Sequence, residues 1–109
     1  MELREMLTAF IYGPYDLRVE KVEYPRLGPK DALVRVRACG ICGSDLHRYV
    51  GSKYGRRFKY PLNSGHEYGG EVAGVGANVS SLRAGDRVTL GVNWLRTPGA
   101  FSEYVKIEN

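Results

Sequence analysis

A mainly β fold, a partly open β-barrel with one or two short helices, is what this sequence of 109 residues predicts. Several short segments alternate apolar and polar side chains with a period of two, as half-buried strands do. Glycine-rich turn signals separate these segments, and only one stretch fits a helix. The length leaves room for one core of ordinary size, so we expect residues 1–109 to form a single domain.

The expected strands follow one another along the chain. The first, 6–12, is rich in β-forming residues and ends at Gly13-Pro14, a turn signal. The second, 17–22, alternates apolar and charged side chains. The third, 31–38, places four small or apolar side chains on one face: Ala32, Val34, Val36 and Ala38. Three more are expected at 67–75, 87–90 and 101–107, the last with Phe101, Glu103, Val105 and Ile107 on one face.

A helical turn is expected from Ser44 to about Val50, with Ser44 or Asp45 as the N-cap. The sequence predicts a long irregular loop at 51–64. From Arg48 onward, across the end of the helical turn and the start of the loop, basic residues interleave with aromatic ones in a segment without any acid: Arg48, Lys53, Arg56, Arg57 and Lys59. Such a pattern can mark a nucleic-acid surface. A solvated loop is the favoured interpretation, and contact with an anionic substrate or cofactor phosphate is a third.

Composition excludes several classes of protein. No apolar run approaches the ~20 residues of a membrane span, and the charged N-terminus lacks the apolar core of a signal peptide. We therefore expect a cytoplasmic protein without a membrane partner. The net charge of +4 is modest, so a nucleic-acid partner is not expected. Cys39 and Cys42 form a C-x-x-C pair, but no β-α-β pattern surrounds them, and a metal role is favoured over a redox one.

Two segments bring chemistry-bearing residues together. Cys42 and His66 are residue types that bind zinc, and Glu67 is either a third ligand or a support beside the metal. Asp45 suits a different task, because a metal-bound histidine usually donates its other N–H to a carboxylate. By spacing alone, an ordinary structural role for the cysteines and for His66 remains an open alternative.

The two segments, Cys39-Gly40-Ile41-Cys42-Gly43-Ser44-Asp45-Leu46-His47 and Gly65-His66-Glu67-Tyr68-Gly69-Gly70-Glu71-Val72, resemble those of the zinc-dependent medium-chain alcohol dehydrogenases, including polyol dehydrogenases. Shorter matches follow at 74–79, 85–88 and 99–105. The resemblance spans nearly all of the chain. It implies the N-terminal catalytic domain of that family, a GroES-like β-barrel, and oxidation of a small-molecule alcohol or polyol with NAD(P).

The resemblance also implies roles for single residues. Cys42 and His66 would be ligands of the catalytic zinc, and Glu67 would lie beside the metal, able to enter its coordination sphere. Asp45 would accept a hydrogen bond from His66. Cys39 matches a position that is not a ligand, so it is expected to be structural.

A proton relay is implied as well. Ser44 would take the proton of the zinc-bound alcohol, and His47 would pass it on through the cofactor ribose, which makes His47 a cofactor-binding residue. Zinc acidifies a bound alcohol, so the relay starts from a group that loses its proton readily. An imidazole titrates near neutral pH, which suits the end of such a relay.

Two parts of the family pattern are missing from the sequence. A short bridge, 92–98, replaces the lobe whose four cysteines hold a structural zinc, so that second zinc is not expected. The sequence ends at Asn109, where family members continue into a Rossmann domain that carries NAD(P) and usually the remaining zinc ligand. Gly74-Val75-Gly76 is not a dinucleotide fingerprint, because no third glycine or helix pattern follows. Zinc binding is therefore expected to be weak or lost, and the isolated chain inactive.

Three interpretations of such a chain stay open. It is a catalytic-domain fragment, a stand-alone GroES-like binding or scaffold module without enzymatic activity, or half of a split enzyme whose Rossmann domain is a separate chain. A co-chaperonin role ranks last, because it does not call for Cys42 and His66. Apolar surface that a second domain would cover also favours self-association.

Overall fold

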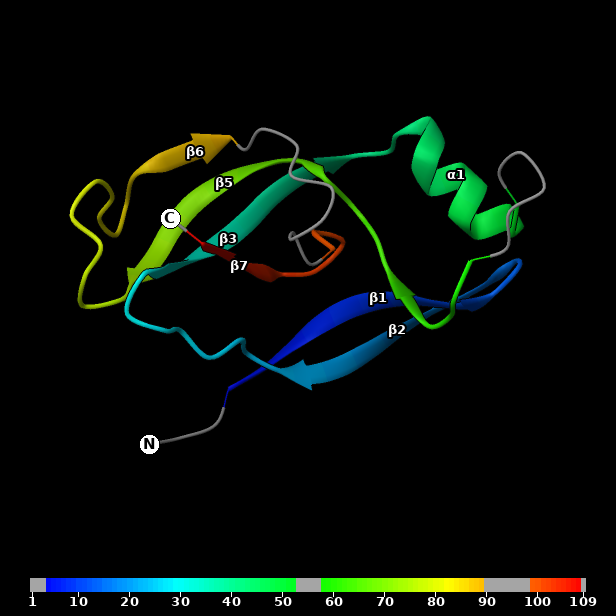
Figure 1. Cartoon of the computed structure of the whole chain (residues 1–109), viewed down its shortest axis with the longest axis horizontal. Coiled ribbons are helices and arrows are strands. Elements are labelled where there is room, and N and C mark those ends of the chain that lie inside the picture. Colours follow the sequence, from blue (N-terminus) through cyan, green and yellow to red (C-terminus); the bar gives the residue numbers. More distant parts are fainter. Residues whose placement is uncertain (1–3, 53–57, 90–98, 109) are drawn as a thin grey trace.

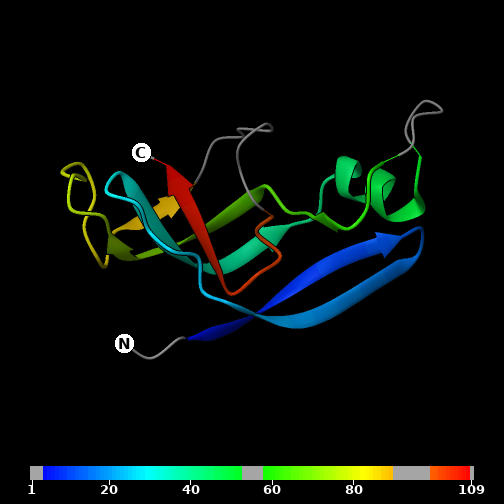
Figure 2. The same ribbon diagram turned by 60° about the horizontal axis from the view of Figure 1, so that its bottom comes forward.

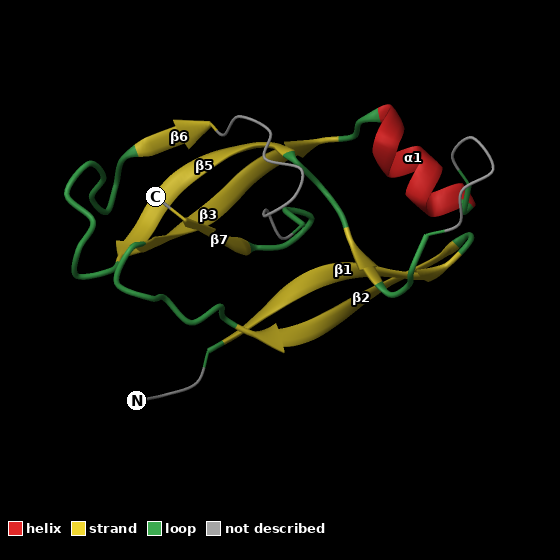
Figure 3. Ribbon diagram, in the orientation of Figure 1, coloured by secondary structure: helices red, strands yellow, loops and turns green. Residues whose placement is uncertain are grey.

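A computed structural model describes residues 4–52, 58–89 and 99–108. Within these ranges the chain is mostly strand, with one helix (Figure 3). The elements in chain order are β1 (Glu5–Gly13), β2 (Asp16–Glu23), β3 (Asp31–Gly40), α1 (Gly43–Val50), β4 (Leu62–Asn63), β5 (Glu67–Val75), β6 (Arg87–Thr89) and β7 (Tyr104–Glu108).

The strands form two antiparallel sheets (Figure 1). The first has the order β2-β1-β4, and the second has the order β6-β5-β3-β7. β1 and β2 are a hairpin whose register runs from the pair Glu5–Glu23 to the pair Gly13–Asp16. The predicted turn at Gly13-Pro14 is therefore confirmed.

A short segment after residue 99 joins the two sheets. Ala9 of β1 donates its backbone N–H to the carbonyl oxygen of Phe101 (2.8 Å), and Glu103 donates to Leu7 (3.1 Å). Val36 of β3, in the other sheet, donates to the carbonyl oxygen of Glu103 (2.9 Å). Because one segment bonds to both sheets, the strands curl into a partly open barrel. The predicted mainly β fold, a partly open barrel with one short helix in the described ranges, is confirmed.

The core lies along β3, which pairs with β5 on one side and with β7 on the other. Val34 is opposite Val72 of β5 and Val105 of β7, and all three side chains are at most 2% exposed. Tyr68 and Ala100 pack with Val34 and Val105 in one buried cluster. The alternation predicted for β3 holds at Ala32 and Val34, which are fully buried.

Three local predictions need correction. Ala38 is exposed, because the register of β3 against β5 shifts between Val36 and Ala38. The last strand begins at Tyr104 rather than Phe101, since residues 101–103 bond to both sheets instead of continuing one ladder. The predicted loop contains β4, a short strand paired with β1. The bridge 92–98 and position 90 lie outside the described residues.

The helix α1 starts one residue earlier than predicted and follows Cys42, which is its N-cap. Neither Ser44 nor Asp45 is the cap; instead, the Asp45 carboxylate accepts the backbone N–H of Cys42 (2.8 Å). α1 lies over the turn end of the β1–β2 hairpin (Figure 2), where Tyr15 donates its backbone N–H to the carbonyl oxygen of Tyr49 (2.8 Å). Among the described residues, no helix has the length and hydropathy of a membrane span.

Candidate metal centre

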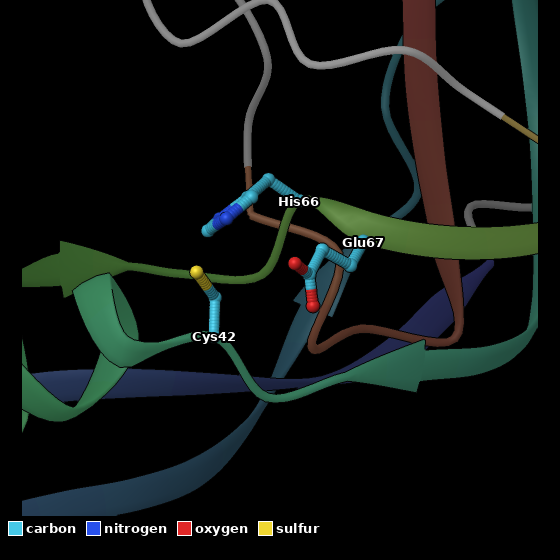
Figure 4. A group of neighbouring side chains, drawn as sticks. All are labelled: Cys42, His66 and Glu67. Carbon is cyan, nitrogen blue, oxygen red and sulfur yellow. The ribbon is translucent and has the colours of Figure 1, made fainter.

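Cys42, His66 and Glu67 come together between α1 and the start of β5 (Figure 4). Their potential ligand atoms, one sulfur, one ring nitrogen and one carboxylate oxygen, all lie within 4.8 Å of one another. Cys42 follows the end of β3, and the other two residues stand where β5 begins. Because β3 and β5 are antiparallel neighbours, the end of one strand lies beside the start of the other.

The three groups differ in exposure. His66 is 8% exposed and Cys42 is half-buried, whereas Glu67 is exposed. A cavity of about 410 Å³ opens beside them, lined by Ala38, Gly40, His66, Glu67, Tyr68, Gly69 and Thr89. The group is therefore anchored on its histidine side and accessible to a small molecule on its glutamate side.

The backbone before His66 is held in place by the far end of the chain. Gly65 has φ +106, a conformation that residues with a side chain rarely adopt. Its carbonyl oxygen accepts the N–H of Ala100, and that of Ser64 accepts the N–H of Phe101, both at 3.0 Å. A Cβ added to Gly65 would lie 2.8 Å from the backbone nitrogen of Phe101. Glycine is therefore required here to orient His66.

Behind His66 lies the carboxylate of Asp45, which is 5% exposed. Its Oδ1 atom is 3.8 Å from Nδ1 of His66, close enough for electrostatic attraction but too long for a hydrogen bond. Oδ2 accepts the backbone N–H of Cys42, so one carboxylate contacts the segments that carry two of the candidate metal ligands, Cys42 and His66. Asp45 therefore lies beside His66, but the hydrogen bond that the resemblance implies is not formed at this distance, and the role of Asp45 stays a prediction.

Two residues of this network were not assigned to the site by the sequence. Ser64, which is 4% exposed, donates its hydroxyl to Oδ1 of Asp45. Arg48 donates to the same Oδ1 atom (3.3 Å) and to Oγ of Ser64 (3.2 Å). The placement of Arg48 in a solvated loop was wrong, because it belongs to α1 and faces the buried carboxylate. The sequence did offer a signal for this contact. Arg48 follows Asp45 by three residues in the predicted helix, and residues three apart are neighbours on a helix surface.

Ser44 and His47, the two residues of the predicted relay, lie on α1. The Ser44 hydroxyl is buried and has no hydrogen-bond partner in the described part of the chain. Nδ1 of His47 lies 3.3 Å from the carbonyl oxygen of Ser52, so the imidazole contacts the end of the helix. No hydrogen bond joins Ser44 to His47 in these ranges, and the relay stays a prediction.

Cys39 differs from Cys42 in its surroundings. Both are free cysteines. Burial raises the pKa of the Cys39 thiol, and the negative charge of Asp45 raises it further. A raised pKa disfavours the thiolate, which is the form that binds metals and attacks disulfides. This observation accords with a structural role for Cys39.

The fold and the site together define a GroES-like barrel that carries a Cys/His/Glu group at the end of its central strands. The profile of the alcohol dehydrogenase GroES-like domain matches residues 28–109. The chain therefore belongs to this family, the N-terminal domain of the zinc-dependent medium-chain dehydrogenases.

Individual relatives agree with this assignment. The chain is 35% identical to L-threonine 3-dehydrogenase of Caldanaerobacter subterraneus subsp. tengcongensis, over 94% of this chain and 37% of that protein. It is 39% identical to sorbitol dehydrogenase of Mus musculus, over 94% of this chain and 28% of that protein. The chain thus spans only about a third of the length of these curated relatives.

Solved structures resemble the chain over nearly all of its length. The 2R,3R-butanediol dehydrogenase of Bacillus subtilis superposes with a TM-score of 0.79 at 30% identity, over 94% of this chain and 38% of that one. A short chain alcohol dehydrogenase from E. coli CFT073, complexed with the cofactor NADH, gives a TM-score of 0.81 at 30% identity. That match covers 95% of this chain and 36% of the other.

Proposed function

We propose that this domain binds a catalytic zinc ion and deprotonates an alcohol or polyol as the catalytic half of an NAD(P)-dependent dehydrogenase. The observation that carries the proposal is the convergence of Cys42, His66 and Glu67 within 4.8 Å, in a chain of this family. These residues come from two segments of the sequence and offer sulfur, nitrogen and oxygen ligands, the set that zinc prefers.

The donor set fits zinc in chemistry and nearly in spacing. Ligand atoms of a tetrahedral zinc site lie roughly 3.3–3.6 Å apart, given metal–ligand bonds of about 2.0–2.3 Å. The present 4.8 Å span therefore needs a contraction of about 1 Å, which exposed Glu67 can supply by rotating its side chain. Because Nδ1 of His66 faces Asp45, Nε2 is the ring nitrogen left for the metal.

The residues of α1 would then move the proton of the alcohol. When bound, zinc would supply Lewis acidity that makes the hydroxyl of the substrate easier to deprotonate. Ser44 has a buried hydroxyl without a partner among the described residues, so it is free to accept that proton. His47, one helical turn further, would receive it and release it toward solvent, with the cofactor ribose between the two residues.

A second structural unit would supply the nicotinamide cofactor. The limited coverage of the relatives, 37% and 28% of their lengths, supports this division of labour. Apolar side chains next to the metal-binding residues support it too, since Ile41 is 71% exposed and Leu46 is 57% exposed. Such side chains suit a surface covered by another domain. We expect no oxidation of alcohols by residues 1–109 alone with NAD or NADP.

Zinc uptake tests this proposal directly. In the presence of excess zinc, the purified chain is expected to take up about one zinc ion per molecule, as measured by native mass spectrometry. Cys42→Ser should abolish this uptake, because the thiolate is lost. Serine is a favourable N-cap residue, so the variant should still fold with α1 intact.

Cys39→Ser is the matched control, since it removes the other thiol of the same C-x-x-C segment. This variant should keep its zinc. A wild-type chain without zinc, or uptake that depends on Cys39 and not on Cys42, would overturn the proposed metal site.

A further inference from the structure

The guanidinium of Arg48 is placed inside the polar network of the site rather than in solvent. Its side chain is 24% exposed, and that of Asp45 is 6% exposed. A buried carboxylate is costly unless it is paired and hydrogen-bonded. Arg48 is the cation that the described residues provide within 4.0 Å of this carboxylate, apart from the imidazole of His66.

The contacts of Arg48 form a closed arrangement with Ser64. One nitrogen, Nη1, donates to Oδ1 of Asp45 at 3.3 Å and to Oγ of Ser64 at 3.2 Å. The Ser64 hydroxyl in turn donates to the same Oδ1 atom. The other oxygen, Oδ2, is already engaged by the backbone N–H of Cys42. Hydrogen bonds within the protein therefore hold both oxygens of the Asp45 carboxylate in place.

The backbone of Arg48 is held in place as well. Tyr60 donates its hydroxyl to the carbonyl oxygen of Arg48 (2.8 Å), which ties the helix to the segment before β4. The guanidinium thus starts from an anchored backbone and reaches back by three residues to Asp45. By contrast, the Arg18 side chain is 57% exposed and pairs with an exposed carboxylate, that of Asp16.

We infer that Arg48 and Ser64 are positioning residues of the metal centre, acting through Asp45 on His66. Their hydrogen bonds hold Oδ1 at 3.8 Å from Nδ1 of His66, in the orientation from which a small movement forms a hydrogen bond. The positive charge of Arg48 also offsets part of the cost of burying this carboxylate. A fixed, charged Asp45 sets the tilt of the imidazole and its strength as a ligand.

This inference rests on the proposed zinc site, and cobalt titration separates the two. Co²⁺ bound through a thiolate gives a near-ultraviolet charge-transfer band and visible bands that report coordination geometry. Arg48→Met should weaken Co²⁺ binding about tenfold or more and alter the visible bands, the size of effect seen when groups behind a metal ligand are removed. Ser64→Ala should weaken it in the same direction.

Arg48→Lys serves as the rescue variant. Both contacts of Arg48 come from a single nitrogen, so a lysine ammonium can replace them, and affinity should return to within about threefold of wild type. Tyr60→Phe is the structural control, because it loosens the backbone of Arg48 and leaves the guanidinium in place. Its effect on the affinity and the bands should be clearly smaller than that of Arg48→Met, because the guanidinium and its two contacts remain.

The possible outcomes are distinct. A wild-type chain without the thiolate band overturns the zinc site, and the role of Arg48 with it. Wild-type affinity and spectrum in Arg48→Met overturn the role of Arg48 alone. Equal losses in Arg48→Met and Tyr60→Phe, or in Arg48→Met and Arg48→Lys, also overturn it, since they indicate general loosening or a purely steric effect. Should Arg48→Met fail to fold, Ser64→Ala and Arg48→Lys decide the question by the same titration.

Discussion

Ala100 donates its backbone N–H to the carbonyl oxygen of Gly65 at 3.0 Å, directly before the histidine of the candidate metal centre. The next residue, Phe101, makes the equivalent bond to Ser64. Phe101 also accepts a hydrogen bond from Ala9 of β1. The segment that joins the two sheets is thus the same one that fixes the backbone of the site. Hydrogen bonds of this one segment therefore both close the barrel and orient His66.

Gly65→Ala tests this relationship. Its φ of +106 disfavours any side chain, and the new Cβ would lie 2.8 Å from the backbone nitrogen of Phe101. Relief of that contact must lengthen the hydrogen bonds to Ala100 and Phe101. We expect the free energy of unfolding, measured with urea, to fall by about 1–3 kcal/mol. Zinc affinity should fall further than the loss of folded protein explains, because His66 moves.

Gly74→Ala is the control for this substitution. It changes a glycine of β5, the strand that follows Gly65, where an added Cβ would have no heavy atom within 4 Å apart from its chain neighbours. Its effect on stability should stay within about 0.5 kcal/mol. Equal costs in the two variants would contradict the special role of Gly65.

Asp45→Asn addresses the charge at the centre of the network. The amide keeps the shape of the carboxylate but leaves Arg48 without its counter-ion and turns one acceptor into a donor. Because hydrogen bonds to charged groups are the stronger kind, we expect an unfolding free energy lower by on the order of 2 kcal/mol. Asp16→Asn, in an exposed pair with Arg18, should change it by less than about 1 kcal/mol. A smaller loss at position 45 than at position 16 would contradict this account.

The sequence predicts the fold well where the pattern is local. The strands β1, β2 and β3 are predicted from residues next to one another in the chain, and Val34 lies in the core as its period-two position requires. The half-buried pattern expected for β2 was wrong at Leu17 and Val19, which are exposed. The start of β7 was missed for the opposite reason. Residues 101–103 contain β-forming side chains, but their backbone groups bond to two sheets at once, and no local pattern encodes that choice.

For the site as well, the sequence predicted some residues and missed others. Cys42, His66 and Asp45 were expected together because the resemblance to the dehydrogenases ties their two segments to one site, and the structure places their side chains side by side. Arg48 was grouped with the basic residues that follow it, because composition cannot tell which cation meets a buried carboxylate. Helix geometry decides this, since residues three apart share one face of α1.

Tyr68, the residue after Glu67, gives the clearest expectation for pH dependence. Burial raises its pKa from 10.0 to about 12, and the nearby Cys39 thiolate adds to the effect. An unfolded chain loses this proton near pH 10, whereas the folded chain keeps it to about pH 12. Between these values the unfolded state binds fewer protons, so the free energy of unfolding falls as pH rises. The stability is fully present below pH 10 and is lost through about pH 12, by on the order of 2–3 kcal/mol.

Tyr68→Phe isolates this contribution from that of the other tyrosines. The Tyr68 hydroxyl is buried without a hydrogen-bond partner among the described residues, so its removal should leave stability at pH 7 unchanged or slightly higher. Urea unfolding at pH 9 and pH 11.5 should then show a smaller loss in Tyr68→Phe than in wild type, because only wild type has the buried phenol at position 68 that ionises on unfolding. Parallel losses in the two proteins would mean that the Tyr68 phenol ionises as easily in the folded barrel as in water, and that its pocket admits solvent.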